Sequence, residues 1–195
     1  MIKAVIFDCY GVLVQGSLHQ FIDTYFSNDD ETIKKAQEIN DKCSIGQISY
    51  EEQIEEFARM SGLSVADTHR EMDKNPPNIQ LLSYISSELK GKYKIGMLSN
   101  AGENLLDSLI GVENVELFDE TVLSYEYHVV KPQPEIYEIT LDKLNVNPEE
   151  AIFVDDIKSY CEAAESLGIK SIQYVNFNQF RNELDNLLNV ADSDE

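Results

Sequence analysis

The sequence predicts an α/β protein whose core is a parallel sheet between two layers of helices, with a small α-helical cap inserted after the first strand. From residue 79 onward, short apolar runs rich in strand-forming residues alternate with helical stretches of about 10 to 15 residues, as in βα units. Residues 18–75, in contrast, carry helical signals and no strand-like run. The length of 195 residues suits one such core with a modest insertion, and it excludes two large domains.

The first strand is predicted at residues 4–7, where the apolar run AVIF suits a fully buried strand and the turn sequence DCYG follows it. In the insertion, residues 49–52 (SYEE) and 64–67 (SVAD) resemble capping boxes, which begin helices. Residues 75–78 (NPPN) close the insertion, because consecutive prolines cannot continue a helix.

Helices and strands alternate after this boundary. Helices are predicted at residues 79–89, 105–110, 134–144, 157–167 and 179–190. Strands are predicted at residues 93–98, within 115–123, at 151–154 and at 171–175. We therefore assign residues 1–15 and 77–195 to a three-layer, Rossmann-like core and residues 16–76 to the helical cap.

Acidic residues outnumber basic ones by 36 to 15, which gives a formal net charge of −21. Surfaces that bind nucleic acid or anionic membranes need a basic stripe, so neither partner is expected. The N-terminal apolar run is too short for a signal peptide, and no apolar stretch approaches the ~18 residues of a membrane span. Cys9, Cys43 and Cys161 form no CxxC pair and are expected to be reduced, buried thiols. These features predict a cytoplasmic protein.

Polar residues follow the predicted strands at the edge where ligands of open parallel sheets bind. They are Asp8, Ser99 with Asn100, Lys131 in the loop VVKP, and Asp155 with Asp156. This set suits phosphoryl transfer, because a carboxylate nucleophile accepts a phosphoryl group when Mg²⁺ held by other carboxylates offsets the like charges. An ammonium group would offset further charge, and a hydroxyl with backbone N–H groups would bind phosphate oxygens. Each residue alone has a structural explanation, such as a turn or a helix N-cap, so the prediction depends on their conjunction.

The motifs IFDxxG, LSN, KPxPEIY and FVDD, in this order, resemble the four motifs of the haloacid dehalogenase superfamily of hydrolases over essentially the whole chain. The last two motifs are most similar to those of glucose-1-phosphate phosphatase-type proteins and of the N-terminal phosphatase domain of soluble epoxide hydrolases. The resemblance implies a Mg²⁺ cofactor whose ligands are Asp8, the backbone carbonyl of Tyr10, Asp156 directly and Asp155 through water. It implies a catalytic set of Asp8 as nucleophile, Ser99 as phosphate contact, Asn100 beside it, and Lys131 as charge stabiliser.

Tyr10 departs from the phosphatase pattern, which usually has a second Asp at this position to protonate the leaving oxygen and to activate water. Tyrosine followed by glycine at this point is similar to the hydrolytic 2-haloacid dehalogenases, in which Asp attacks carbon without a metal. Two features argue against that alternative. The pair Asp155 and Asp156 is intact, and neither Arg59 nor Arg70 in the cap lies in a recognisable position for halide binding.

The predicted function is therefore Mg²⁺-dependent hydrolysis of a small phosphomonoester through an aspartyl-phosphate on Asp8, slowed by the phenol of Tyr10. The alternatives are a 2-haloacid dehalogenase and a non-catalytic binding or regulatory protein that kept the fold. His19 is a candidate substitute acid, because an unperturbed histidine titrates near neutral pH. A small phosphorylated metabolite suits the net charge of −21 better than a polyanion does. The sequence leaves the substrate and the oligomeric state open.

Overall fold

The computed structural model describes residues 1–26 and 29–192, and it contains a sheet of five parallel strands in the order β3-β2-β1-β4-β5. The strands are β1 Ala4–Phe7, β2 Lys94–Ser99, β3 Glu120–Leu123, β4 Ala151–Asp155 and β5 Lys170–Gln173. Strand β1 lies at the centre, with Phe7 opposite Met97 of β2 on one side and opposite Val154 of β4 on the other. The predicted α/β class is confirmed.

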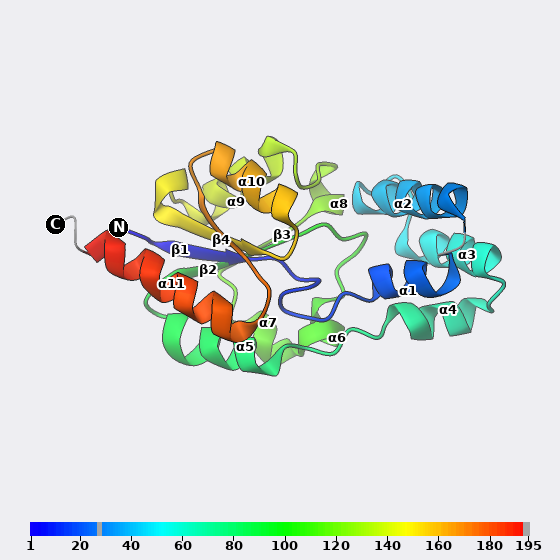
Figure 1. Cartoon of the computed structure of the whole chain (residues 1–195), viewed down its shortest axis with the longest axis horizontal. Coiled ribbons are helices and arrows are strands. Elements are labelled where there is room, and N and C mark those ends of the chain that lie inside the picture. The colour runs from blue at the N-terminus through cyan, green and yellow to red at the C-terminus, as the bar shows by residue number, and fades with distance from the viewer. Residues whose placement is uncertain (27–28, 193–195) are drawn as a thin grey trace.

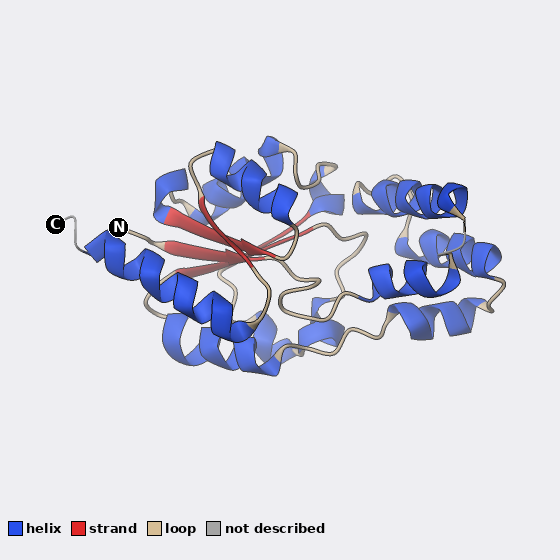
Figure 2. Ribbon diagram, viewed as in Figure 1, coloured by secondary structure: helices blue, strands red, loops and turns tan. Residues whose placement is uncertain are grey.

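Helices cover both faces of the sheet, as Figures 1 and 2 show. One face carries α5 Ile79–Tyr84 with its π-helical continuation Ile85–Leu89, α6 Leu106–Ile110 and α11 Phe177–Asp192. The opposite face carries α9 Pro134–Leu144 and α10 Lys158–Ser166. Three short segments were not predicted from the sequence: α7 Val112–Val115, α8 Ser124–Tyr127 and the 3₁₀ turn Pro148–Glu150.

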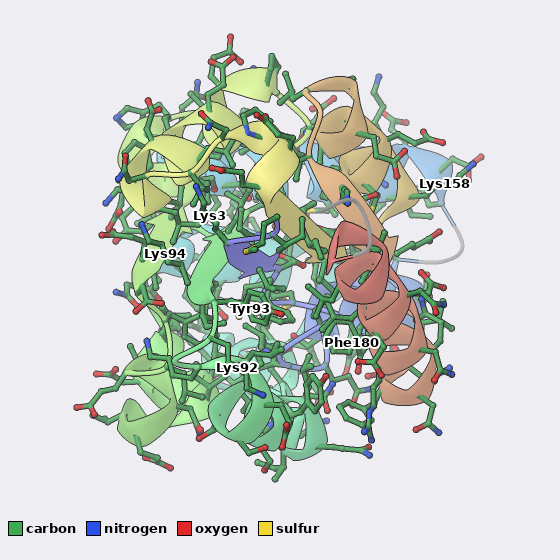
Figure 3. All side chains as sticks on the ribbon, turned by 90° about the vertical axis from the view of Figure 1, so that its left-hand side faces the viewer. Lys3, Lys92, Tyr93, Lys94, Lys158 and Phe180 are labelled. Carbon is green, nitrogen blue, oxygen red and sulfur yellow. The ribbon has the colours of Figure 1, made fainter. Side chains whose placement is uncertain are left out.

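The sheet is buried on both faces because alternate residues of its central strand pack in opposite directions. Val5 and Phe7 belong to the apolar cluster beneath α5 and α11, whereas Ala4 and Ile6 belong to the cluster beneath α9 and α10. Phe7 meets the ring of Phe180 edge-on at 5.9 Å. Figure 3 shows Phe180 on α11, viewed from the amino ends of the strands. Burial on both sides explains why the central strands are continuous apolar runs in the sequence.

Four helices lie beyond the carboxyl ends of the strands (Figure 1), and we call them the cap helices. They are α1 Ser17–Tyr25, α2 Asp30–Ser44, α3 Tyr50–Ser61 and α4 Val65–Met72. Their own apolar core includes the rings of Phe21 and Phe57, which stack at 5.6 Å. All four lie inside the range 16–76 that the sequence assigned to the cap, and the division into two domains stays a prediction.

The predicted helix starts in the cap are present, with one difference in detail. Ser49 and Glu52 form the reciprocal bonds of a capping box. Ser64 also caps its helix by accepting the Asp67 N–H at 3.1 Å. The second capping box is nevertheless incomplete, because the Asp67 carboxylate accepts the Ser64 hydroxyl at 2.6 Å instead of the backbone N–H. Aspartate is one methylene shorter than the glutamate of a full box.

The two chain segments that lead into and out of the cap pair with each other, and the cap also contacts the core directly. The chain segments on either side of the insertion bridge one another at Val14 and Pro77. In the direct contact, the buried Ser124 hydroxyl of α8 donates to the carbonyl of Ser44 at the end of α2 (2.6 Å) and accepts the Ala101 N–H (3.0 Å). The described helices include none that is long and apolar enough to cross a membrane. The three cysteines are buried and unpaired, as predicted.

Candidate active site

Three of the predicted site residues lie at the carboxyl ends of neighbouring strands. Asp8 directly follows β1, Ser99 is the last residue of β2, and Asp155 is the last residue of β4. Lys131 comes from the loop between α8 and α9 and is only 2% exposed. The topology brings these groups together because parallel strands all end at the same edge of the sheet.

Lys131 bridges two buried carboxylates. Its ammonium nitrogen lies 2.7 Å from Asp8 Oδ1 and 2.6 Å from Asp155 Oδ2. Burial alone would lower the pKa of Lys131, but the two carboxylates outweigh it and raise that pKa above its usual range. The ammonium group also lies 5.4 Å from the centre of the Phe153 ring and 5.2 Å from that of Tyr160. The lysine is therefore held as a cation at a buried position.

Asp8 experiences opposing effects. The pKa of Asp8 is raised from 3.8 to about 7. Burial is the largest cause, the negative charges of Asp155 and Asp156 act in the same direction, and Lys131 opposes them. Burial likewise raises the pKa of Asp156, with a further contribution from Asp155. Burial is the main cause of both shifts, and a cation bound at this end of the sheet would favour the charged forms of Asp8 and Asp156.

Asn100 acts on the backbone of Lys131. Its side-chain oxygen accepts the Lys131 N–H at 2.9 Å, and its amide nitrogen donates to the Lys131 carbonyl at 3.1 Å. This pair of bonds fixes the loop that carries the lysine. Asn100 also lines the cavity, and its place in the catalytic set stays a prediction.

Two buried side-chain polar atoms in the described part of the chain have no hydrogen-bond partner: the Ser99 hydroxyl oxygen and Asp156 Oδ1. Ser99 is 1% exposed, and a buried hydroxyl without a hydrogen-bond partner costs folding free energy. A bound ligand that forms a hydrogen bond to this hydroxyl would remove the cost. A phosphate oxygen would accept a hydrogen bond from Ser99, and a cation would be coordinated by the unpartnered Oδ1 of Asp156.

The carboxylates fit a hard divalent cation. One oxygen each from Asp8, Asp155 and Asp156 lies within 4.8 Å of the others. Both oxygens of Asp155 are already engaged, by Lys131 at 2.6 Å and by the Ile157 N–H at 2.8 Å. Asp8 and Asp156 retain free coordination capacity, so they suit direct ligation and Asp155 suits an outer position.

Gly11 keeps the space beside Asp156 open. A Cβ atom at this position would lie 2.5 Å from Asp156 Cγ, and the backbone has φ +94°, which side chains rarely adopt. The turn after β1 can approach the acidic residues this closely only because it contains glycine.

A cavity of about 1030 Å³ lies between the sheet edge and the cap helices. Asp8, Lys131 and Asp156 line it from the core. Tyr10 also lines it, and burial raises the pKa of this phenol well above 10, so the group stays neutral. His19, the candidate acid, lies on the same cavity and is exposed.

Several cavity residues were missed by the sequence analysis. They are Asp23, Asn40, Asp41, Tyr50, Gln53, Asp73, Glu103 and Tyr160. Most come from the cap helices or the segments that flank them, and no motif marks them. Their positions depend on how four helices pack together, which helical periodicity alone does not give.

Comparison with known proteins gives concordant results. A family model for haloacid dehalogenase-like hydrolases matches residues 2–168. The D-ribitol-5-phosphate phosphatase of Bacteroides thetaiotaomicron is 27% identical over 97% of this chain and all of its own length. The bifunctional epoxide hydrolase 2 of Rattus norvegicus is 36% identical over 55 residues, which are 28% of this chain and 10% of that protein. A crystal structure of a haloacid dehalogenase family enzyme from B. thetaiotaomicron, in complex with magnesium and inorganic phosphate, superposes with a TM-score of 0.69 at 26% identity, over 90% of this chain and 95% of that one.

Proposed function

The chain belongs to the haloacid dehalogenase-like hydrolases, and on that premise we propose that it hydrolyses a small phosphomonoester with Mg²⁺ through an aspartyl-phosphate on Asp8. In the first step, an Asp8 oxygen forms a bond to phosphorus while the bond from phosphorus to the alcohol oxygen breaks, and that oxygen takes up a proton from Tyr10 or from solvent. In the second step, water forms a bond to phosphorus and the acyl phosphate bond breaks, which regenerates the carboxylate and releases inorganic phosphate. The observation that carries the proposal is Asp8 beside Lys131, with the unpartnered Ser99 hydroxyl and Asp156 oxygen at the same strand ends.

Each site residue has a role in this scheme. Lys131 offsets the negative charge of Asp8 and of the phosphoryl group, and Ser99 donates a hydrogen bond to a phosphate oxygen. Asp8, Asp156 and the backbone carbonyl of Tyr10 would hold Mg²⁺, with Asp155 acting through water. When bound, the ion supplies the positive charge that lets one anion approach another.

The relatives support a small phosphorylated metabolite as substrate. The relative that this chain covers completely is named as a phosphatase of D-ribitol 5-phosphate, a phosphorylated polyol. A cavity of about 1030 Å³ accommodates a molecule of that size with its solvent.

The dehalogenase alternative has weaker support. Arg59 pairs with Glu56, and Arg70 pairs with Asp67, all at exposed or partly exposed positions. Neither arginine is among the residues that line the cavity. A dehalogenase would also have no use for the acidic pair Asp155 and Asp156, which is costly to bury without a cation.

The proposed function is tested by a phosphate-release screen over many phosphomonoesters, with Mg²⁺ and with a chelator. Mg²⁺-dependent release from at least one ester is the expected result. A parallel halide-release assay on 2-haloacids without metal would detect the dehalogenase. Retained ligand binding without release in either assay would indicate a binding or regulatory protein.

The metal ligands are predicted to differ in importance. Asp155→Asn should raise the Mg²⁺ concentration needed for half-maximal activity by roughly 10- to 100-fold, the usual range for an outer-shell partner. Asp156→Asn should raise it further and remove most activity, because it takes away a direct ligand. A Mg²⁺ titration of both variants makes the comparison. Equal effects, or a larger effect at Asp155, would contradict the assignment.

Tyr10 is predicted to limit the protonation of the leaving oxygen. Tyr10→Asp should accelerate hydrolysis of alkyl phosphates by about 10- to 100-fold, a part of the usual range for acid–base catalysis, and of aryl phosphates by much less. Alkoxides need a proton to leave, whereas nitrophenolate departs unassisted. The ratio of kcat/KM for the two ester types at saturating Mg²⁺ is the measurement, with Tyr10→Asn as the matched variant that lacks the acid.

An unchanged ratio in Tyr10→Asp would contradict this prediction and would make His19 the candidate acid for the leaving oxygen. In that case His19→Gln should slow alkyl phosphates selectively, because it removes the other titratable candidate on the cavity wall.

A further inference from the structure

The wall of the cavity away from the reacting carboxylates is itself strongly acidic. Besides Asp8 and Asp156, four carboxylates line the cavity: Asp23, Asp41, Asp73 and Glu103. Lys131 is the one lysine or arginine among the described lining residues, and Asp8 and Asp155 already neutralise it. None of the four carboxylates forms an ion pair with a basic side chain within residues 1–26 and 29–192.

Two of these carboxylates face the cavity from opposite sides. Asp73 follows α4 in the cap, and Glu103 follows β2 in the core. The Tyr50 hydroxyl donates to Asp73 Oδ1 at 3.3 Å. Tyr50, Asp73 and Glu103 all line the cavity, and burial together with the two negative charges raises the pKa of Tyr50 above its usual range. Their negative charges therefore act on the same region of the cavity.

The loop that carries Glu103 packs closely against the cap at Gly102. A Cβ atom on Gly102 would overlap the sulfur of Cys43, so α2 packs directly against this loop. The cap and the loop that carries Glu103 are thus in contact through the side chain of Cys43.

Two histidines, His19 and His69, also line the cavity, and His69 Nε2 lies 2.9 Å from Glu51 Oε2. The amide side chains on the wall are neutral. Gln53 is 3% exposed, and its amide nitrogen donates to Asn40 Oδ1 at 3.0 Å. Amides both donate and accept hydrogen bonds, which suits the hydroxyl groups of a polyol or sugar.

We propose that Asp23, Asp41, Asp73 and Glu103 make the site selective against phosphate esters whose alcohol part carries a further negative charge. The accepted substrates are then esters of neutral polyhydroxylated alcohols and of amino alcohols. This inference rests on the proposed function, which assigns the phosphoryl end of the substrate to Asp8 and Lys131. A carboxylate or second phosphate on the alcohol part would meet these four carboxylates, and the one lysine or arginine among the described lining residues, Lys131, is already paired with Asp8 and Asp155. Like-charge repulsion of this kind disfavours a wrong ligand.

The experiment compares esters that differ in one charge. Glucosamine 6-phosphate, glucose 6-phosphate and 6-phosphogluconate form one series, and glycerol 3-phosphate with 3-phosphoglycerate forms a second. In each series the anionic member should have a kcat/KM on the order of 10²-fold below that of the neutral member. The amino sugar ester should match or exceed the neutral one.

Matched variants identify the residues responsible. Glu103→Gln and Asp73→Asn should each raise kcat/KM for the anionic esters roughly 3- to 10-fold more than for the neutral ones, because each removes one repulsive charge. Glu138→Gln removes the same charge from an exposed position on α9 outside the cavity and should leave the ratio unchanged.

Equal rates for anionic and neutral esters, or an unchanged ratio in both cavity variants, would overturn the inference. If no ester is hydrolysed, the proposed function fails instead. Calorimetric Kd values for the same esters then decide the charge selectivity separately: the same ranking supports it, and equal affinities contradict it.

Discussion

Replacement of Asp8 by asparagine is expected to abolish phosphate release, with a loss of about 10⁴-fold or more in kcat. The substitution keeps the shape of the side chain and removes the nucleophile. Release of phosphate from the best ester of the screen, at saturating Mg²⁺, is the measurement. Asp142→Asn, at an exposed position on α9, is the matched control and should retain full activity. Undiminished turnover in Asp8→Asn would refute the assignment of the site.

The same variant should remain folded, which separates loss of chemistry from loss of structure. Because burial raises the pKa of Asp8 to about 7, ionising this group costs stability as the pH rises from about 4 to above 7. Asparagine carries no such cost, and Lys131 keeps Asp155 as a partner at 2.6 Å. The free energy of unfolding of Asp8→Asn in urea, at pH 8 without metal, should therefore equal or exceed that of the wild type. A marked drop would mean that Asp8 is required for the fold.

Lys131→Met is expected to have the largest effect on stability, a loss of about 3 to 5 kcal/mol at pH 8 together with loss of activity. The substitution leaves Asp8 and Asp155 buried beside one another with no cation between them. Protonation relieves that repulsion, so the loss should be smaller at pH 5 than at pH 8. Urea unfolding at both pH values measures it.

Lys143→Met is the matched control for this variant. Lys143 pairs with Glu120 at 3.4 Å, with side chains 37% and 38% exposed, and an exposed pair is worth at most about 1 kcal/mol. If Lys131→Met is too unstable to purify, the double variant with Asp155→Asn should recover part of the stability, because it removes one of the two buried carboxylates that lack a cation. Equal losses for Lys131→Met and Lys143→Met would contradict the role of the buried bridge.

The sequence predicted the central part of the site because topology and chemistry coincide there. Asp8, Ser99 and Asp155 each directly follow or end an apolar run, and parallel strands bring such positions to one edge. Lys131 was predicted from its motif, and the structure places its ammonium between two of these carboxylates. The action of Asn100 on the Lys131 backbone could not be read from the sequence, because it depends on the conformation of a loop 31 residues away.

The cap was predicted in type and not in detail. Capping signals located the starts of α3 and α4, since these are local features. The short helices α7 and α8 were missed because four residues give no periodicity. The placement of Asp73 and Glu103 on one cavity arises from packing between the cap and the core, so it became visible only in three dimensions.

Lys131 is held both at its backbone and at its ammonium group, which fixes the position of its positive charge before the reaction. Asn100 fixes its backbone, and two carboxylates and two aromatic rings confine its ammonium group. A free lysine side chain has about 2 kcal/mol of rotamer entropy to lose on ordering. Here folding has already removed that freedom, so the positive charge stands in place before any ligand arrives. The electrostatic field along the line of attack is thus preorganised, and little rearrangement of this charge remains for the transition state.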